Sequence, residues 1–313
     1  MVIPLGPAPR RSDGLADDSP PGWPAAPWWQ HAAVRLIGFV LVMVVGLMIF
    51  GTVAVLVAPH SDAVGATSEL AASLTAYFAV VIGLEQRRHP LELALHRWRG
   101  LAVGLAIGAL MCAVVVAAIA ALGGYVVTGV DWSRPAAGEI WVLGVVAGVS
   151  EELIFRGMVF RLVESAVGTW GALVVSGALF GLIHRANPQA TWAGAVAIAI
   201  EAGLSFGLLY ALTRSLWVVI VVHAAWNVVQ GAVFGIDVSG SGTGSGVLIS
   251  HPAGPVLLSG GRFGIEASVV SVACWTLLSI GCAVLLVRGR RIIAPSWTRH
   301  RRLRNDRQVT DSG

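Results

Sequence analysis

Runs of apolar residues long enough to cross a bilayer recur along the whole chain, separated by short polar segments. An α-helix rises about 1.5 Å per residue, so about 20 residues cross the ~30 Å hydrocarbon core of a membrane. Of the 313 residues, 56% are hydrophobic and only 12% are charged, whereas a soluble domain carries about 25% charged residues. The pattern predicts an all-α fold, a polytopic transmembrane helical bundle. We expect about eight spans, at 34–58, 67–84, 101–122, 140–162, 169–184, 193–213, 215–235 and 266–287.

Two polar ends frame a single membrane domain that covers residues 34–287. Residues 1–33 are rich in Pro with scattered Asp and Arg, which is the composition of a disordered arm. Residues 288–313 form an Arg-rich tail. The segment between the last two spans is rich in Gly and Ser, and we expect a loop there.

The basic residues, all 21 of which are Arg, are distributed asymmetrically between the two sides of the predicted bundle. They cluster after the second span and after the last span, whereas the opposite loops hold few. The positive-inside rule therefore places both termini in the cytoplasm, which an even number of spans requires. The clustered residues are Arg87, Arg88, Arg97 and Arg99 in the loop, and Arg288, Arg290, Arg291, Arg299, Arg301, Arg302, Arg304 and Arg307 in the tail.

The basic tail also bears on partners and origin. Beside a last transmembrane helix, such a tail is typical of a topology signal attracted to anionic lipid headgroups. We therefore expect the lipid bilayer, and no nucleic acid, as a partner. Abundant Ala, Gly and Arg without any Lys indicate a GC-rich bacterial genome, so we expect a multi-pass protein of a bacterial plasma membrane.

Two adjacent acidic residues, Glu151 and Glu152, lie within the apolar stretch 139–162, with Arg156 one turn further on. A charge at bilayer depth costs about 2.5–3.5 kcal/mol on insertion scales, so a helix that only spans the membrane would not retain three. Glu152 and Arg156 are i,i+4 on one helix face, where they can form an ion pair. Glu151 is turned about 100° away, so a buried ion pair alone leaves it without a partner.

Two later spans carry further polar pairs at the same spacing. The sequence FGLIH places Phe180 one turn before His184, where the aromatic ring can pack beside the imidazole. The sequence HAAWN places His223 and Asn227 on one helix face, a pair that can bind a metal or donate hydrogen bonds to an oxyanion. Each pair alone is compatible with helix packing, but three patterns on neighbouring spans favour a shared site. Pro188 is expected to end the helix just after His184.

The depth of these residues supports their convergence. From the nearest predicted cytoplasmic ends, Glu151 lies ~17 Å deep, His184 ~20 Å and His223 ~10 Å, at about 1.5 Å per residue. A carboxylate and two imidazoles within the hydrocarbon, with Asn227 nearby, can activate water and stabilise a tetrahedral intermediate.

Together the three patterns resemble those of the CPBP intramembrane proteases, a family that groups type II CAAX prenyl endopeptidases with bacteriocin-processing and bacteriocin-immunity (Abi-like) proteins. That family is marked by EExxxR, FxxxH and HxxxN/D on successive late helices, and this chain has EELIFR, FGLIH and HAAWN in that order. The resemblance covers about 140–235, the expected protease core. It implies an intramembrane endopeptidase whose substrate is a membrane-associated peptide or protein, cleaved in or near the cytoplasmic half of the bilayer.

Carried over residue by residue, the resemblance implies that Glu151 activates water with assistance from His184. The His–Asn pair of HAAWN would stabilise the oxyanion, and the Glu–Arg pair of EELIFR would orient its helix. The catalytic residues implied in this way are Glu151, Glu152, Arg156, His184, His223 and Asn227.

A second version of the family mechanism makes His184 and His223 ligands of a metal such as Zn²⁺, with Glu151 or Glu152 completing the ligand set. The sequence contains no HExxH, the usual helical signature of zinc proteases. Two His on different helices also leave the set incomplete without a carboxylate. The sequence leaves both versions open, and we favour metal-free Glu/His chemistry.

Two other functions also stay open. A transporter coupled to ions or protons could use the same buried residues as a relay, and it would be expected to contain an internal repeat, which we do not find in the sequence. A non-catalytic immunity or scaffold protein could bind a membrane peptide without cleaving it. Glu201, in the sixth predicted span, has no place in the three motifs; it could pair with Arg156 or Arg161, or face a water-filled cavity.

Overall fold

The computed structural model describes residues 31–94, 99–134, 136–242, 244–299 and 301. The predicted disordered arm therefore lies almost wholly outside the described residues, as do the last twelve residues of the predicted tail and, in the loop after the second span, Arg97.

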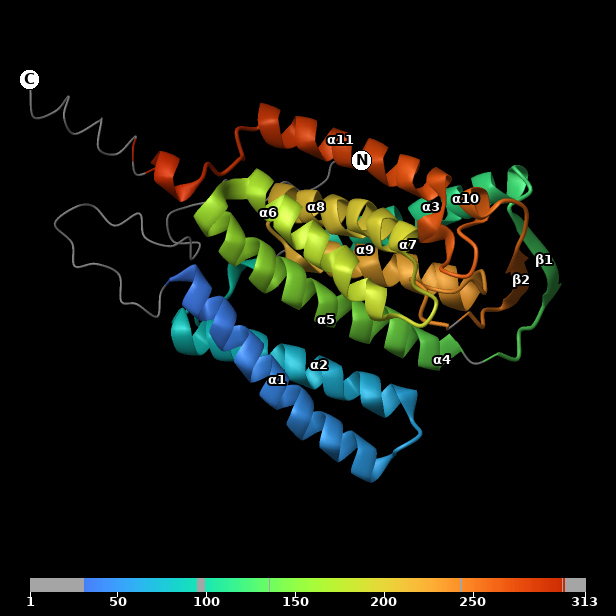
Figure 1. Ribbon diagram of the computed structural model, residues 1–313, viewed down its shortest axis with the longest axis horizontal. Coiled ribbons are helices and arrows are strands. Elements are labelled where there is room, and N and C mark those ends of the chain that lie inside the picture. The colour runs from blue at the N-terminus through green and yellow to red at the C-terminus, as the bar shows by residue number, and fades with distance from the viewer. Residues whose placement is uncertain (1–30, 95–98, 135, 243, 300, 302–313) are drawn as a thin grey trace, which may run out of the picture.

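Seven helices in the described part of the chain are long and apolar enough to cross a membrane, and they pack side by side as a bundle (Figure 1). The predicted all-α, polytopic architecture is confirmed, and the chain is a multi-pass membrane protein. The seven helices cover Ala32–Val57, Asp62–Leu84, Gly100–Ala121, Ala137–Ala186, Trp192–Thr213, Leu216–Val233 and Val269–Arg288.

The fourth of these helices holds two of the predicted spans. It is 50 residues long, and its helical geometry breaks at Gly168, where φ is 78° and ψ is 175°. The chain turns back at this point, at the end of the bundle opposite the strands (Figure 1). Glycine suits a positive φ, and a Cβ here would also lie 2.7 Å from the carbonyl oxygen of Ile293. The chain therefore makes the eight crossings that the sequence predicts.

The second helix starts earlier than its predicted span. The helix begins at Asp62, rather than at 67, because Ser61 caps its polar first turn: the Ser61 hydroxyl accepts a hydrogen bond from the Val64 amide at 3.4 Å. Such a cap satisfies an amide that has no partner within the helix.

The crossings are built from α-helical pieces and from π-type (η) pieces, with short 3₁₀ turns (also η) beside them. Wider π-type turns inside helices frequently occur at functional sites. In chain order the segments are α1 (Ala32–Val57), α2 (Asp62–Phe78), η2 (Ala79–Leu84), η3 (Leu91–Leu93), α3 (Arg99–Ala121), α4 (Ala136–Glu139), η5 (Ile140–Ala147), α5 (Gly148–Glu152), η6 (Leu153–Phe160), α6 (Arg161–Ile183), η7 (His184–Ala186), α7 (Trp192–Ile198), η8 (Ala199–Leu204), α8 (Ser205–Thr213), α9 (Leu216–Val228), η9 (Val229–Val233), α10 (Val256–Ser259), η10 (Ile265–Ala267) and α11 (Val269–Arg288).

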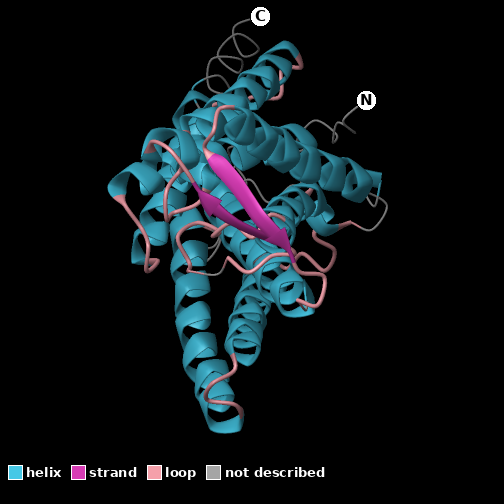
Figure 2. Ribbon diagram, turned by 90° about the vertical axis from the view of Figure 1, so that its right-hand side faces the viewer, coloured by secondary structure: helices cyan, strands magenta, loops and turns pink. Residues whose placement is uncertain are grey.

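Two short strands cover one end of the bundle (Figure 2). Strand β1 (Tyr125–Val130) pairs antiparallel with β2 (Leu248–Pro252). The Tyr125 hydroxyl donates a hydrogen bond to the carbonyl of Phe234 at 2.7 Å, which ties the strands to the end of η9. The Gly/Ser-rich segment that we expected to be a loop therefore contains a strand, whose partner lies more than 100 residues away in the sequence. We call this end of the molecule the loop side.

A buried ion-pair network joins the segment after the second crossing to the helix that carries EELIFR. Arg161 contacts Glu85 at 2.9 Å, and Arg87 contacts Glu92 at 2.5 Å. The Tyr77 hydroxyl donates to Glu92 at 2.9 Å. Burial raises the pKa of Glu92, but Arg161 and Arg87 outweigh it and hold this pKa below its ordinary value. These contacts fix α2 and the start of α6 relative to each other.

Glycines on α3 allow that helix to pack against the backbone of α9. A Cβ added at Gly108 would lie 2.3 Å from the carbonyl oxygen of Val222 and 2.9 Å from the Cβ of Ala225. A Cβ at Gly104 would lie 2.7 Å from the carbonyl oxygen of Val218. Small residues spaced four apart permit such close approach between membrane helices, and α9 is the helix that carries HAAWN.

We expect Gly108→Ala to destabilise the protein by about 1–3 kcal/mol, the usual cost of overpacking a close-packed interior. Gly51→Ala is the matched control, because a Cβ at Gly51 in α1 meets nothing within 4 Å; its stability should stay the same or rise by about 0.5–1 kcal/mol. Thermal unfolding in detergent measures both. Equal unfolding temperatures for the two variants would contradict the close contact between α3 and α9.

Candidate active site

The predicted site residues come from three crossings that meet inside the bundle. Glu151 lies on α5, His184 on η7 at the end of α6, and His223 on α9. The Nε2 atoms of His184 and His223 lie 3.8 Å and 4.0 Å from the same atom, Oε2 of Glu151. The Glu151 side chain is 24% exposed, against 9% and 7% for the two imidazoles. The Glu151 side chain is therefore the most exposed of the three, although Oε2, the oxygen that faces both imidazoles, is buried and has no hydrogen-bond partner among the described residues.

Glu152 faces the interior, as its helical offset from Glu151 predicts, and its side chain is fully buried. Its Oε1 accepts hydrogen bonds from Arg156 at 2.8 Å and from Nδ1 of His223 at 2.9 Å. The predicted Glu152–Arg156 pair is confirmed. The contact with His223 adds what the sequence did not show: this carboxylate positions an imidazole from another helix.

Arg156 is completely buried and makes contacts on several sides. One of its terminal nitrogens donates to the carbonyl of Ala202 at 2.7 Å. Its guanidinium lies over two aromatic rings, at 4.7 Å from the centroid of Phe180 and 5.4 Å from that of Phe206. Such cation–π contacts are strongest where the cation is desolvated. Sequence reasoning missed Phe206, because no motif spacing marks it.

The second nitrogen of each imidazole is held by a partner. Nδ1 of His184 donates to the carbonyl of Phe180 at 2.7 Å, so that Nε2, which is directed at Glu151, is the acceptor of the neutral tautomer. The ring centroids of Phe180 and His184 are 4.7 Å apart, which confirms the packing predicted from FGLIH. The α-helix also ends at Ile183, and a 3₁₀ turn over His184–Ala186 follows, two residues before Pro188, which agrees with the predicted helix end. In His223, the carboxylate of Glu152 on Nδ1 stabilises the imidazolium form, in which Nε2 becomes a donor.

Asn227 lies one turn beyond His223 and is 5% exposed. Its amide nitrogen donates one hydrogen bond to the carbonyl of Leu143 at 3.1 Å, which leaves its second N–H available. His223 and Asn227 both line a cavity of about 20 Å³. The structure thus brings the HAAWN pair to one face, as the spacing predicts.

Glu201 does not form either of the ion pairs considered from the sequence. Arg156 pairs with Glu152, and Arg161 pairs with Glu85. Neither carboxylate oxygen of Glu201 has a hydrogen-bond partner within the described part of the chain. The side chain instead lines the same small cavity as His223, so the alternative that it faces a cavity is the correct one.

The residues do not form a closed zinc site. Ligands of one tetrahedral Zn²⁺ at about 2.0–2.1 Å would lie about 3.3–3.4 Å apart, whereas the carboxylate–imidazole distances are 3.8 Å and 4.0 Å. No group of three or more His, Cys, Asp or Glu side chains among the described residues has the arrangement of a metal site. We therefore derive no chemical step through a metal.

Residues 133–229 match the family model of the Rce1-like type II CAAX prenyl endopeptidases. The match contains all three motifs and both helices that carry the imidazoles. It confirms the resemblance to the CPBP family found from the motifs. No curated protein sequence matches the chain.

Proposed function

We propose that this multi-pass membrane protein, whose residues 133–229 match the Rce1-like family, is an intramembrane endopeptidase. It hydrolyses a peptide bond in a membrane-associated peptide or protein. The observation that carries this proposal is the partly exposed Glu151 carboxylate facing two imidazole Nε2 atoms at 3.8 Å and 4.0 Å. Carboxylates and imidazoles in such proximity are suited to general acid–base catalysis.

In the first step, Glu151 takes a proton from a water molecule, and the water oxygen attacks the carbonyl carbon of the scissile bond. The 3.8 Å between Glu151 and His184 leaves both groups within reach of one water oxygen, so the acceptor Nε2 of His184 can share its second proton. The electron pair of the carbonyl bond moves to the oxygen, which gives a tetrahedral oxyanion. General-base assistance of this kind contributes about 10²–10⁴-fold to rates.

In the second step, the imidazolium of His223 and the free N–H of Asn227 donate hydrogen bonds to the oxyanion. Glu152 holds the opposite nitrogen of His223 at 2.9 Å and stabilises its charge. The proton carried by Glu151 passes to the amide nitrogen, the C–N bond breaks, and the oxyanion reforms a carbonyl. The products are a carboxylic acid and an amine, and one water molecule is consumed.

We expect peptide hydrolysis to survive treatment with a chelator, because the proposed chemistry uses no metal. The assay offers a library of quenched apolar peptides to the protein purified in detergent, before and after chelation, with metal analysis of the same sample. His184→Ala serves as the reference for lost chemistry, with an expected decrease of about 10²–10⁴-fold. Activity that disappears with chelator and returns with Zn²⁺ would favour the metal version. Hydrolysis that is absent from the wild type would favour a transporter or a non-catalytic immunity protein.

The arrangement in the membrane forms part of the proposal. Both termini lie in the cytoplasm, because the Arg-rich segments lie on the side opposite the strands. The composition supports a bacterial plasma membrane. The partners are the lipid bilayer and a membrane peptide or protein, and no nucleic acid.

A further inference from the structure

Glu201 is a buried acid that the proposed reaction does not use. It is 2% exposed, and neither of its carboxylate oxygens has a hydrogen-bond partner among the described residues. The hydroxyl of Ser271 on α11 is a polar neighbour of this carboxyl, but it makes no hydrogen bond of normal geometry to Glu201 or to any other described residue. An unsatisfied buried polar group costs about 1–3 kcal/mol, so a retained one points to a ligand.

The cavity beside Glu201 fits one small polar ligand. Its volume is about 20 Å³, and a cavity needs about 10–15 Å³ to hold one water molecule. A buried water also needs two to four polar partners. The cavity offers five, from four different segments: Glu201, His223, Asn227, Ser239 and Glu266.

Glu266, one of the residues that line this cavity, is held by several hydrogen bonds. One of its oxygens accepts from the Gln230 amide at 2.7 Å, and the other accepts from the Ser239 backbone at 3.0 Å and hydroxyl at 3.1 Å. Burial raises the pKa of Glu266 to about 7, although these hydrogen bonds act in the opposite direction. The carboxyl group can therefore donate or accept a hydrogen bond near neutral pH.

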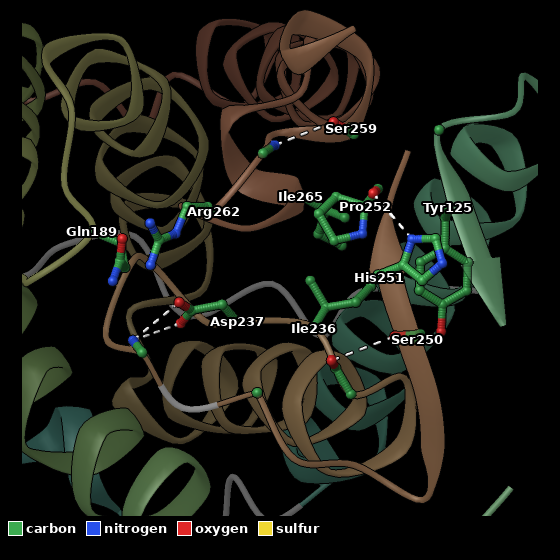
Figure 3. A pocket seen from close by; sticks show the side chains of 15 residues that line it. Tyr125, Gln189, Ile236, Asp237, Ser250, His251, Pro252, Ser259, Arg262 and Ile265 are labelled. Atoms are coloured by element: carbon green, nitrogen blue, oxygen red, sulfur yellow. Dashed lines mark hydrogen bonds between the residues drawn. The ribbon is translucent and has the colours of Figure 1, made fainter. Parts of the chain in front are cut away.

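A larger pocket lies directly behind Glu266 on the loop side. It has a volume of about 320 Å³, and Asp237, Arg262 and Ile265 are among the residues that line it (Figure 3). Ile265 faces this pocket, and the next residue, Glu266, faces the small cavity. Polar side chains such as Gln189, Asp237 and Arg262 give the larger pocket a lining that water wets readily.

Residues that line the two spaces are in contact with each other. A Cβ at Gly264 would lie 2.2 Å from the carbonyl oxygen of Asp237 and 2.5 Å from a carboxylate oxygen of Glu266. Gln230 bridges the same two groups, since its amide donates to both at 2.7 Å. Because Asp237 lines the loop-side pocket and Glu266 lines the cavity that also contacts His223, hydrogen bonds join the linings of the two spaces.

We propose that Glu201 and Glu266 hold a water molecule in this cavity and that the cavity is a route for water. Along this route, water passes from the loop-side pocket through the cavity to Glu151, where the hydrolysis consumes it. The supply role rests on the endopeptidase function proposed above; the bound water does not. A hydrolytic site enclosed in hydrocarbon needs a polar route for water, because apolar side chains do not retain it. Glu201 acts in this route as a positioning residue.

Radiolytic labelling tests the bound water without any enzyme assay, because hydroxyl radicals formed from a buried water modify the side chains beside it. Trp226 lines the cavity and is 4% exposed. We expect Trp226 to be labelled in the full-length wild type and in Glu201→Gln, and to lose its label in Glu201→Leu, which removes the polar anchor. Trp132, which is 83% exposed, should be labelled equally in all three. An unlabelled Trp226 in the wild type, or equal labelling in Glu201→Leu, would overturn the water site.

Peptide hydrolysis tests the supply. We expect Glu201→Leu to lower kcat by about tenfold with KM unchanged, the pattern of a group that acts after substrate binding. Glu201→Gln, which still binds water, should recover most of the rate.

Thermal stability separates this role from a structural one, because an apolar replacement of an unpartnered buried acid should preserve or raise stability. Ser165→Ala, which removes a buried hydroxyl that donates to the Leu162 carbonyl at 2.6 Å, controls for loss of a polar group elsewhere. A Glu201→Leu enzyme with the wild-type kcat would refute the supply role.

Discussion

Glu151→Gln is expected to lower peptide hydrolysis by about 10²–10⁴-fold, because an amide cannot take the proton from the attacking water. The fold should survive, since the side chain is 24% exposed and Gln has the same size. The nearest imidazole atoms lie 3.8 Å and 4.0 Å away, beyond hydrogen-bond distance, so no contact that holds the helices together is lost. Steady-state kinetics with a quenched apolar peptide, together with thermal unfolding in detergent, measure the two effects separately.

Asp62→Asn is the matched control for this substitution. Asp62 is an exposed acid in the first turn of α2, and its change also removes one negative charge from a membrane-spanning helix. We expect kcat to stay close to the wild-type value. A Glu151→Gln protein that hydrolyses the peptide at the rate of Asp62→Asn would remove Glu151 from the chemistry.

Glu152→Gln is expected to cost both stability and activity. It leaves the completely buried Arg156 without a compensating charge, and breaking a buried ion pair in this way costs about 3–5 kcal/mol. It also replaces the carboxylate that accepts from Nδ1 of His223 at 2.9 Å, so the imidazolium that faces the oxyanion is weakened. The unfolding temperature of Glu152→Gln should lie well below that of Glu151→Gln, and its kcat should lie below the wild-type value.

A double substitution separates the two losses. Adding Arg156→Met to Glu152→Gln removes the uncompensated charge, and replacing both partners of a buried pair by groups of similar volume is often neutral in stability. The double variant should regain stability relative to Glu152→Gln but stay inactive, because His223 still lacks its carboxylate. A single Glu152→Gln variant as stable as the wild type would show that the ion pair contributes little.

The topology and the motif faces could be predicted because they depend on local properties of the chain. Hydrophobic length alone fixes which segments cross a bilayer, and eight crossings follow from it. A spacing of four residues places two side chains on one helix face, so Glu152 with Arg156, Phe180 with His184, and His223 with Asn227 were paired correctly. The family match over residues 133–229 contains all three of these patterns.

The contacts between segments far apart in the chain could not be predicted in this way. Glu152 and His223 are 71 positions apart, and no periodicity indicates that one carboxylate oxygen serves both this imidazole and Arg156. The partner of β2, the aromatic ring of Phe206 beneath Arg156, and the cavity between Glu201 and Glu266 likewise depend on how the crossings are rotated about their axes.

The sequence by itself therefore determined the membrane fold and the three motif faces, since these follow from helix length and helix period, while the resemblance carried by the motifs implied which residues take part in the proposed chemistry. Only the tertiary structure decided which side chain meets which. It turned Glu151 toward two imidazoles, gave Glu152 to His223 as well as to Arg156, and left Glu201 unpaired beside a cavity. The physical reason is that a buried polar group takes the partner that packing brings within about 3 Å, and in this bundle packing between helices is set by close contacts such as that of Gly108 with α9.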